Sequence, residues 1–409
     1  MTTVNGQNVD ELFQTDSFKK SLKSAEHVIQ YVNKQYISIN DSDYTVYANH
    51  LKAVLSTLVP LMKKADTLFN NLYQKEHFAG SYADKLKIGK PTEYDMNLII
   101  KLPVSPDNLE FEDAAPSFIK IKVNRVAFEK ASTDLNFYGR GWVDDEGYLL
   151  QTKFRDWMES VLTKALNPLE LDESPEGNYG NTRCLKVRKD NAGEQVYKIG
   201  HKKSGPAMTL KVVTPDNCAL DVDLVPAFQF GHPKWPTSVI PLPETSANKS
   251  WVVIPKPKKL KDGVKLEVND TREWRMSFLD QEREIIKESG TVKPTIKLLK
   301  KLRDTNSLKQ LSSYAIKTVV MLEMEKNQPD FWKNRSTFIF LFMLNRLIGH
   351  IKSGHIPFFW DKRDDLLKMG KTQAENVGGC LTRLLKDMVK NVESNPCIIA
   401  EKLCKYAQK

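Results

Sequence analysis

Acidic residues interrupt two apolar strand-like segments, and this pattern constrains the fold more than any other feature of the chain. Residues 93–101 read EYDMNLIIK, and residues 217–230 read NCALDVDLVPAFQF. Side chains alternate between the two faces of a β-strand, so Glu93 and Asp95 share one face. Acids among aliphatic residues are costly to keep ionised, and they need a cation or a hydrogen-bond network as a partner. Two acids on one face can share a hard divalent cation.

A glycine and a serine precede the first acidic pair. Residues 80–95 read GSYADKLKIGKPTEYD, a small loop and a basic turn that lead into the strand. Gly80 has no side chain to block the close approach of a phosphate, and Ser81 adds a hydroxyl group and a backbone amide to hold it. The arrangement predicts a triphosphate substrate carried with Mg2+ or Mn2+. The alternative is an edge strand with two solvated acids after an ordinary Gly-Ser turn.

The second segment supplies a third carboxylate. Asp221 and Asp223 alternate with leucine and valine, and we predict that Asp223 is the third metal ligand beside Glu93 and Asp95. Three carboxylates suit a two-metal site, in which one ion activates an attacking hydroxyl group and the other stabilises the pyrophosphate leaving group. The predicted reaction is nucleotidyl transfer. The alternative is a strand at the sheet edge with both aspartates facing water.

Three further motifs occur in a fixed order along the chain. They are SGPAMTL at 204–210, EWRMSF at 273–278 and LSSYAIKT at 311–318. Together with the GS and E-x-D motifs and VDLVPAF, they resemble the metazoan male-abnormal branch of the nucleotidyltransferase superfamily, which contains cyclic GMP-AMP synthase and the cGAS-like receptors. The resemblance spans residues 45–370.

The resemblance implies an α+β, bilobal nucleotidyltransferase fold, in which an N-terminal mixed sheet with a long spine helix is followed by a C-terminal helical bundle. We expect an N-terminal helical segment at 1–40, a nucleotidyltransferase core lobe at 41–255 and a C-terminal helical lobe at 256–409. Alternation and β-branched residues predict strands between 96 and 253. Apolar periodicity predicts helices at 17–36, 44–73, 149–166, 272–288, 293–303, 307–325 and 332–351. The helix at 44–73 would deliver the chain directly to the loop at Gly80.

The resemblance also assigns nucleotide-binding residues. Lys297 and Ser313 would hold the donor triphosphate, together with Gly80 and Ser81, and Tyr314 would stack on a base. Arg275 and Ser277 would face the acceptor or the reaction intermediate. Tyr314 is equally compatible with packing inside a helical bundle, and Arg275 with a charge on a helix surface.

One departure from the family pattern bears on the activator. Cyclic GMP-AMP synthase carries a zinc-binding insertion of one His and three Cys, and here the flanking segments are joined through residues 291–294 without either residue type. No zinc is therefore expected. The insertion clamps duplex DNA in the family, so its absence disfavours DNA and resembles the cGAS-like receptors, for which double-stranded RNA is the usual activator. A-form duplexes are read through shape and backbone contacts, which suits a basic surface.

The positive charge of the chain is clustered. Its 409 residues carry a net charge of +10, and this surplus by itself is compatible with a merely solvated basic surface. Clusters that converge on one face would bind phosphates without reading sequence. We predict nucleic-acid contacts for Lys186, Lys202, Lys203, Lys256, Lys258, Lys259, Lys300 and Lys301.

The remaining composition indicates an ordinary globular protein. Its five cysteines are odd in number and lack C-x-x-C spacing, which argues against a disulfide framework or a zinc cluster. The first residues are polar, and no apolar run approaches the ~20 residues that cross a bilayer. We expect a cytoplasmic protein without membrane contact.

The predicted function is a nucleic-acid-activated enzyme that makes a cyclic dinucleotide of the cyclic GMP-AMP type from ATP and GTP. Double-stranded RNA is the expected activator, and a cyclic-dinucleotide receptor would read the product in innate antiviral signalling. Two alternatives stay open: a catalytically silent interaction protein, and a synthase of linear oligonucleotides of the oligoadenylate type. Retention of all three acids speaks against the first alternative, and the three later motifs favour the cyclase over the second.

Overall fold

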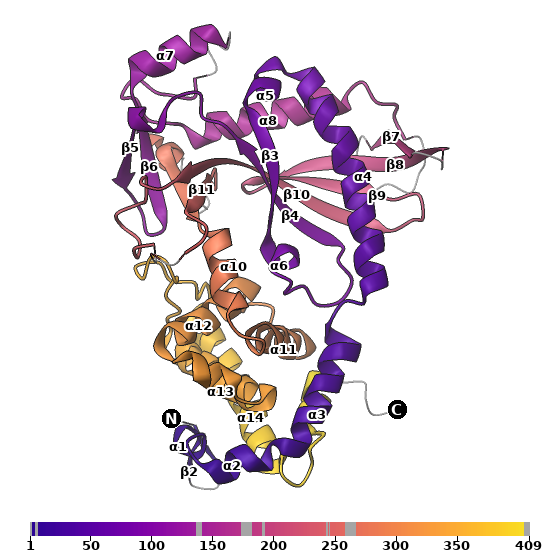
Figure 1. Cartoon of the computed structure of the whole chain (residues 1–409), viewed down its shortest axis with the longest axis vertical. Coiled ribbons are helices and arrows are strands. Elements are labelled where there is room, and N and C mark those ends of the chain that lie inside the picture. The colour runs from indigo at the N-terminus through magenta and orange to yellow at the C-terminus, as the bar shows by residue number, and fades with distance from the viewer. Residues whose placement is uncertain are drawn as a thin grey trace. The chain divides into compact units, whose positions relative to one another are not determined.

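The computed structural model describes residues 2–4, 7–135, 141–172, 182–189, 193–242, 244, 246–257 and 267–404. The chain divides into two compact units, each drawn in Figure 1. The sheet unit comprises Asn40–Asp84 and Lys90–Asp280, and the helical unit comprises Met1–Ile39, Lys85–Gly89 and Gln281–Lys409. The predicted domain boundaries at residues 40 and 255 stay predictions.

The sheet unit contains most of the strands. Its strands are β3 Tyr73–Ala79, β4 Glu93–Ile100, β5 Leu109–Asp113, β6 Phe118–Val123, β7 Arg183–Lys189, β8 Gly193–Ser204, β9 Ala207–Val213, β10 Ala219–Gly231, β11 Ser250–Ile254 and β12 Glu273–Ser277. Its helices are α4 Asp41–Ala65, α5 Thr67–Leu72, α6 Gly80–Ala83, η2 Pro106–Asn108, α7 Arg125–Asp134, α8 Gln151–Leu166 and α9 Val268–Arg272.

These strands form one ten-stranded mixed sheet. The order along the sheet is β5-β6-β12-β11-β10-β9-β8-β7, and β4 pairs with both β10 and β3. The β4–β10 pair is parallel, and the other pairs are antiparallel. The two acidic strands, β4 and β10, lie about 130 residues apart in the chain and are direct neighbours in the sheet.

The even-numbered side chains of β4 and β10 face the helices of this unit. The ring of Phe154 on α8 lies 4.3 Å from that of Phe228 on β10. Tyr82 contacts Tyr94 of β4 and stacks on Tyr44 of α4, with ring centroids 4.5 and 5.0 Å apart. Burial of Phe154, Phe228, Tyr82 and Tyr94 stabilises one face of the sheet by excluding water from it. The odd-numbered side chains, including the acids, project from the opposite face.

The helical unit contains the C-terminal bundle and the first 39 residues. Its elements are β1 Thr3–Val4, β2 Gln7–Asn8, α1 Val9–Leu12, α2 Asp16–Ser21, α3 Lys23–Val32, η1 Asn33–Ile37, α11 Val292–Thr305, α12 Ser313–Lys326, η3 Pro329–Lys333, α13 Ser336–Ser353, α14 Lys371–Asn391 and α15 Ile398–Leu403. The remaining helix, α10 Leu279–Lys287, begins in the sheet unit and continues into this one. Of the helices that the structure describes, none has the length and apolar character needed to span a membrane.

The N-terminal helices are held to the bundle by a cap between distant segments. Glu26 of α3 accepts hydrogen bonds from the backbone amides of Ser336 and Thr337, at 3.1 and 2.9 Å. These amides open α13 and have no partner within that helix, so a carboxylate placed there satisfies them and complements the helix dipole. The ring of Phe13 adds apolar contacts to Phe338 and Phe342, at 5.8 and 5.9 Å between centroids.

The predicted α+β fold, with a sheet, a long helix and a C-terminal bundle, is confirmed. Two local predictions were wrong. The helix predicted at 44–73 breaks at Asp66 into α4 and α5, and β3 follows α5, so the chain does not pass directly from a helix to a loop and Gly80 opens the short helix α6 after a strand. The helix predicted at 272–288 is interrupted by β12, whose five residues alternate between half-buried and buried because β6 and β11 pair with them.

Candidate active site

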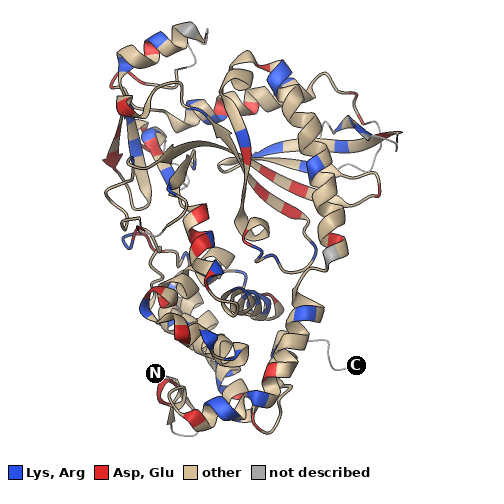
Figure 2. Ribbon diagram, viewed as in Figure 1, with Lys and Arg blue, Asp and Glu red and all other residues tan. Residues whose placement is uncertain are grey.

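The acids of β4 and β10 lie in register on one face of the sheet. Asp221 is the Cα partner of Glu93, and Asp223 is the partner of Asp95. In Figure 2, red segments that mark Asp and Glu lie side by side on these two strands. Partners on adjacent strands lie about 5 Å apart, so each pair brings like charges together and requires compensation. We call this side of the sheet the carboxylate face.

The neighbouring strand β9 compensates the two aspartates differently. Thr209, the register partner of Asp223, donates its hydroxyl hydrogen bond to Asp223 Oδ1 at 2.5 Å. Lys211, the register partner of Asp221, forms a hydrogen-bonded ion pair with Asp221. The face therefore has two rows across three strands: Thr209–Asp223–Asp95 and Lys211–Asp221–Glu93. Sequence reasoning missed the two β9 residues.

Gly80 packs directly against Asp95. Its φ of +65° lies in the left-handed region, and a Cβ atom built on it would lie 1.8 Å from Asp95 Oδ2 and 2.6 Å from its Cγ. Only glycine fits both the backbone conformation and this approach. Ser81 follows in the first turn of α6 and is partly exposed. The predicted phosphate-holding pair thus adjoins the predicted metal ligand, with the backbone of residue 80 against its carboxylate.

A histidine and an aspartate lie beside the next row of the sheet. His77 of β3 is the register partner of Asn97 on β4, two residues beyond Asp95. His77 Nε2 lies 3.0 Å from Asp280 Oδ1, and both side chains are largely buried. The pair ties β3 to the start of α10, next to the site.

Arg275 and Ser277 reach the same side of the sheet as the acids. Met276 is paired through Val253 with Phe228, which faces α8, so the flanking Arg275 and Ser277 project from the carboxylate face. The guanidinium of Arg275 lies 5.4 Å from the ring of Phe118 on β6. The structure therefore brings both predicted acceptor residues onto the face predicted to hold the metal, although from a strand rather than a helix.

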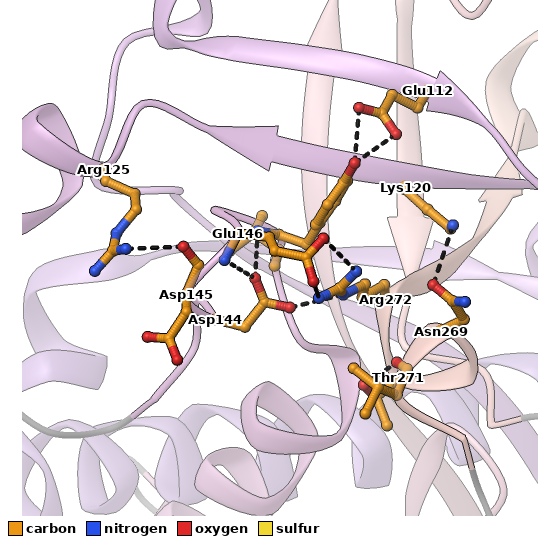
Figure 3. Close-up of polar contacts among 12 residues, drawn as sticks. Glu112, Lys120, Arg125, Asp144, Asp145, Glu146, Asn269, Thr271 and Arg272 are labelled. Carbon is orange, nitrogen blue, oxygen red and sulfur yellow. Dashed lines mark hydrogen bonds and ion pairs between the residues drawn. The ribbon is translucent and has the colours of Figure 1, made fainter.

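A buried arginine fixes the start of β12. Arg272 donates a hydrogen bond from Nε to Asp144 Oδ2 at 2.7 Å and two from its Nη atoms to the carboxylate of Glu146, at 3.1 and 2.8 Å (Figure 3). Its guanidinium also lies 4.5 Å from the ring of Tyr148. These contacts raise the pKa of Arg272, chiefly through the hydrogen bond to Glu146. Such a bidentate pair holds geometry well, and it anchors the chain three residues before Arg275.

The other predicted nucleotide-binding residues belong to the helical unit. Burial lowers the pKa of Lys297, with a further contribution from Lys293, and Lys297 Nζ lies 3.5 Å from Ser38 Oγ. Ser313 Oγ accepts a hydrogen bond from Arg303 at 2.8 Å. The hydroxyl of Tyr314 donates to Glu282 at 2.5 Å. The roles assigned to Lys297, Ser313 and Tyr314 stay predictions.

Tyr314 shares its acceptor with two other donors. Glu282 is 1% exposed and also accepts hydrogen bonds from Lys317 at 2.8 Å and from Trp360 Nε1 at 3.2 Å. A buried carboxylate needs such partners, and the lysine supplies its counter-charge. The network orients Tyr314 within the bundle, which is the alternative that the sequence left open for this residue, but the sequence pattern did not indicate the shared acceptor Glu282.

The eight predicted nucleic-acid lysines occupy different environments. Lys186 is paired with Glu170 at 3.0 Å, and Lys203 with Asp156 and Glu159 at 2.7 and 2.5 Å. Lys202 and Lys256 are exposed and Lys301 is half-buried, whereas Lys258 and Lys259 lie outside the described residues.

Lys300 differs from the other five lysines of this set that the structure describes. It is 4% exposed, and its Nζ donates to the carbonyl oxygen of Leu86 at 2.6 Å. Burial, together with Arg303, lowers its pKa to about 8. A nucleic-acid role for these eight lysines stays a prediction.

The carboxylate face suits a divalent cation in its residue types and its register. Among the described residues, no three Asp, Glu, His or Cys side chains are gathered as a ready metal-binding group. Asp221 and Asp223 instead accept hydrogen bonds from β9. Carboxylates from two adjacent strands, with a glycine backbone against one of them, are nevertheless the oxygen donors that Mg2+ or Mn2+ takes when a substrate phosphate supplies the remaining ligands.

Two family models match successive parts of the chain. The Mab-21 protein nucleotidyltransferase domain matches residues 82–288, and the Mab-21 protein HhH/H2TH-like domain matches residues 291–383. The first match contains Glu93, Asp95 and Asp223, and the second contains α11 and α12.

Similar proteins extend over nearly the whole chain. A cyclic GMP-AMP synthase-like receptor of Ctenocephalides felis is 34% identical over 393 residues, which cover 92% of this chain and 86% of the relative. The corresponding receptor of Aethina tumida is 30% identical over 389 residues, covering 94% and 93%. That of Tribolium castaneum is 29% identical over 393 residues, covering 94% of each. The chain belongs to the Mab-21 family and is a nucleotidyltransferase related to the cyclic GMP-AMP synthase-like receptors.

Proposed function

We propose that this protein is a nucleic-acid-activated nucleotidyltransferase that joins ATP and GTP into a cyclic dinucleotide of the cyclic GMP-AMP type and releases pyrophosphate. The observation that carries the proposal is the row Thr209–Asp223–Asp95 with the backbone of Gly80 against Asp95. A carboxylate pair from adjacent strands beside a close-approach glycine is what a metal-bound triphosphate requires.

Glu93, Asp95 and Asp223 are the proposed ligands of Mg2+ or Mn2+. When bound, the cation would offset the charge of the triphosphate and of the attacking hydroxyl group. Gly80 leaves space for the carboxylate of Asp95, and the hydroxyl and amide of Ser81 would donate hydrogen bonds to a phosphate. Arg275 and Ser277, on the same face, would orient the acceptor nucleotide, because a guanidinium and a hydroxyl group are suitable donors to phosphate oxygens.

The product and the activator are proposed from the relatives and from charge. The names of the relatives, cyclic GMP-AMP synthase-like receptors, support a cyclic dinucleotide and a receptor role. The net charge of +10 supports a polyanionic activator. Residues 288–291 join α10 directly to α11, where cyclic GMP-AMP synthase carries its DNA-clamping insertion, which favours double-stranded RNA over DNA. We place this activity in cytoplasmic antiviral defence, with a cyclic-dinucleotide receptor reading the product.

The test is the product of the purified full chain. The protein is incubated with labelled ATP and GTP and with Mn2+, alone, with duplex RNA or with duplex DNA, and the products are treated with phosphatase and identified by mass spectrometry. We expect a phosphatase-resistant cyclic dinucleotide with duplex RNA. A linear product would instead support the oligoadenylate type of synthase. No product with any nucleic acid would contradict the enzymatic proposal.

A further inference from the structure

Two aspartates of β10 face the predicted metal site, and they have different partners on β9. Asp221 and Asp223 are two residues apart, and each lies opposite a carboxylate of β4. On their other side, Asp221 faces a cation and Asp223 faces an uncharged hydroxyl group. Three carboxylates suffice for a two-metal site, so one of the four is surplus.

The lysine neutralises the surplus aspartate. The side chains of Lys211 and Asp221 are 17% and 39% exposed, so their ion pair is partly shielded from water and is stronger than one at an open surface. A carboxylate held by an ammonium group presents less negative charge to a metal ion. Lys211 also reduces the repulsion between Asp221 and Glu93, which lie opposite each other.

Thr209 orients the carboxylate of Asp223 without neutralising its charge. Thr209 is 6% exposed, and its hydroxyl group donates to Asp223 Oδ1, which leaves the carboxylate its full charge and its second oxygen for another ligand. A hydrogen bond from a second residue to a ligating carboxylate fixes its direction.

From these contacts, the geometry points to Lys211 and Thr209 as positioning residues that select Asp223, and not Asp221, as the ligand contributed by β10. This inference rests on the proposed function, because it concerns the metal that the proposed reaction uses. It goes beyond that function by assigning roles to a lysine and a threonine and by explaining why one of two adjacent aspartates is used.

Charge then determines the effect of each substitution on metal binding. Lys211→Met removes a positive charge next to the site and releases Asp221, so Mn2+ should bind about tenfold more tightly. Asp221→Asn leaves Lys211 uncompensated, so Mn2+ should bind about tenfold more weakly. The double variant restores the net charge and should return to within about threefold of the wild-type affinity.

The experiment measures free Mn2+ by electron paramagnetic resonance during titration of the full chain, first without nucleotide and then with a non-hydrolysable ATP analogue. Lys198→Met is the matched control, because it removes a lysine of the neighbouring strand β8 that is paired with Asp172, and it should leave Mn2+ affinity unchanged. Thr209→Val should weaken Mn2+ binding about tenfold, and Thr209→Ser should restore it, since serine keeps the donor. Melting temperatures of all variants are measured alongside, so that a loss of fold is recognised.

Two results would overturn the inference in different ways. If the wild type binds Mn2+ but Lys211→Met leaves its affinity unchanged, Lys211 does not select the ligand. If Asp221→Asn abolishes Mn2+ binding as completely as Asp223→Asn does, Asp221 is itself a ligand. A folded wild-type protein that binds no Mn2+ either alone or with a non-hydrolysable ATP analogue would instead contradict the proposed function.

Discussion

Strand β10 and helix α11 both carry charged side chains, yet they distribute them in opposite ways. On β10, alternation places Asp221 and Asp223 on one face, where each meets partners on both neighbouring strands. On α11, the adjacent residues Lys300 and Lys301 differ: the first is buried against the carbonyl oxygen of Leu86 and the second is half-buried. A charged pattern in a strand therefore indicates which residues act together, whereas a basic run on a helix does not.

The difference has a geometric cause. Residues two apart on a strand always share a face, and register with the next strand extends that face sideways. Adjacent residues on a helix point about 100° apart, so one of them can enter the core while the other meets water. Substitutions in the sheet and in the helix test this contrast.

The largest effect is expected from Asp95→Asn. Asp95 is a proposed metal ligand, and its carboxylate packs against Gly80. Loss of its charge should reduce product formation about a thousandfold or more, while binding of duplex RNA is retained. Product is measured by mass spectrometry and RNA binding by fluorescence anisotropy. Glu110→Gln, an exposed acid on the edge strand β5, is the control and should remain active. Activity of Asp95→Asn within tenfold of the wild type would remove this carboxylate from the site.

Gly80→Ala should have the next largest effect. Its Cβ atom would lie 1.8 Å from Asp95 Oδ2, so either the carboxylate or the backbone must move, and we expect about a hundredfold loss of activity. Gly205→Ala is a matched control, because Gly205 also has a positive φ, +56°, but has open space around its Cβ position. Equal losses of activity in the two variants would show that backbone conformation, and not contact with Asp95, is responsible.

Burial of Lys300 should make the free energy of unfolding depend on pH. The folded pKa of about 8 lies below the ordinary value of 10.5, so between these values the unfolded chain binds a proton that the folded chain lacks. Stability relative to Lys300→Met should therefore rise with pH across this window, by about 3 kcal/mol in total. The free energy of unfolding is measured by urea titration at several pH values. The stability of the wild type relative to Lys301→Met should not rise in this way across the same pH window.

The smallest effect is expected from two adjacent lysines of β8. Lys202 is exposed on the carboxylate face, as the register partner of Thr209, whereas Lys203 is paired with Asp156 and Glu159. If basic residues of the sheet unit contact duplex RNA, Lys202→Gln should reduce the slope of log affinity against log salt by about one. Lys203→Gln should change it less, because its charge is already compensated. A larger change for Lys203→Gln would reverse this ranking.

Much of the candidate site follows from the sequence, because strand periodicity is local. The shared face of Glu93 and Asp95 needs no knowledge of the fold, and the choice of Gly80 needs only its chemistry. Thr209 and Lys211 could also have been found, since the turn around Asn217 sets the register that places them opposite Asp223 and Asp221.

Other features could not be obtained in this way. The five residues of β12 become a strand only because β6 and β11, far away in sequence, pair with them. The burial of Lys300 depends on Leu86, a residue more than 200 positions earlier. The shared acceptor of Tyr314, Lys317 and Trp360 is likewise a product of packing in the bundle.

The most direct test of the account compares Asp223→Asn with Asp221→Asn in the same product assay, with labelled ATP and GTP, Mn2+ and duplex RNA. The two residues lie on one strand and one face, and they differ in their β9 partners. We predict that Asp223→Asn forms no detectable product, while Asp221→Asn retains about a tenth or more of the wild-type activity at saturating Mn2+. Full activity of Asp223→Asn, or loss of activity in Asp221→Asn alone, would contradict the assignment of the catalytic carboxylates.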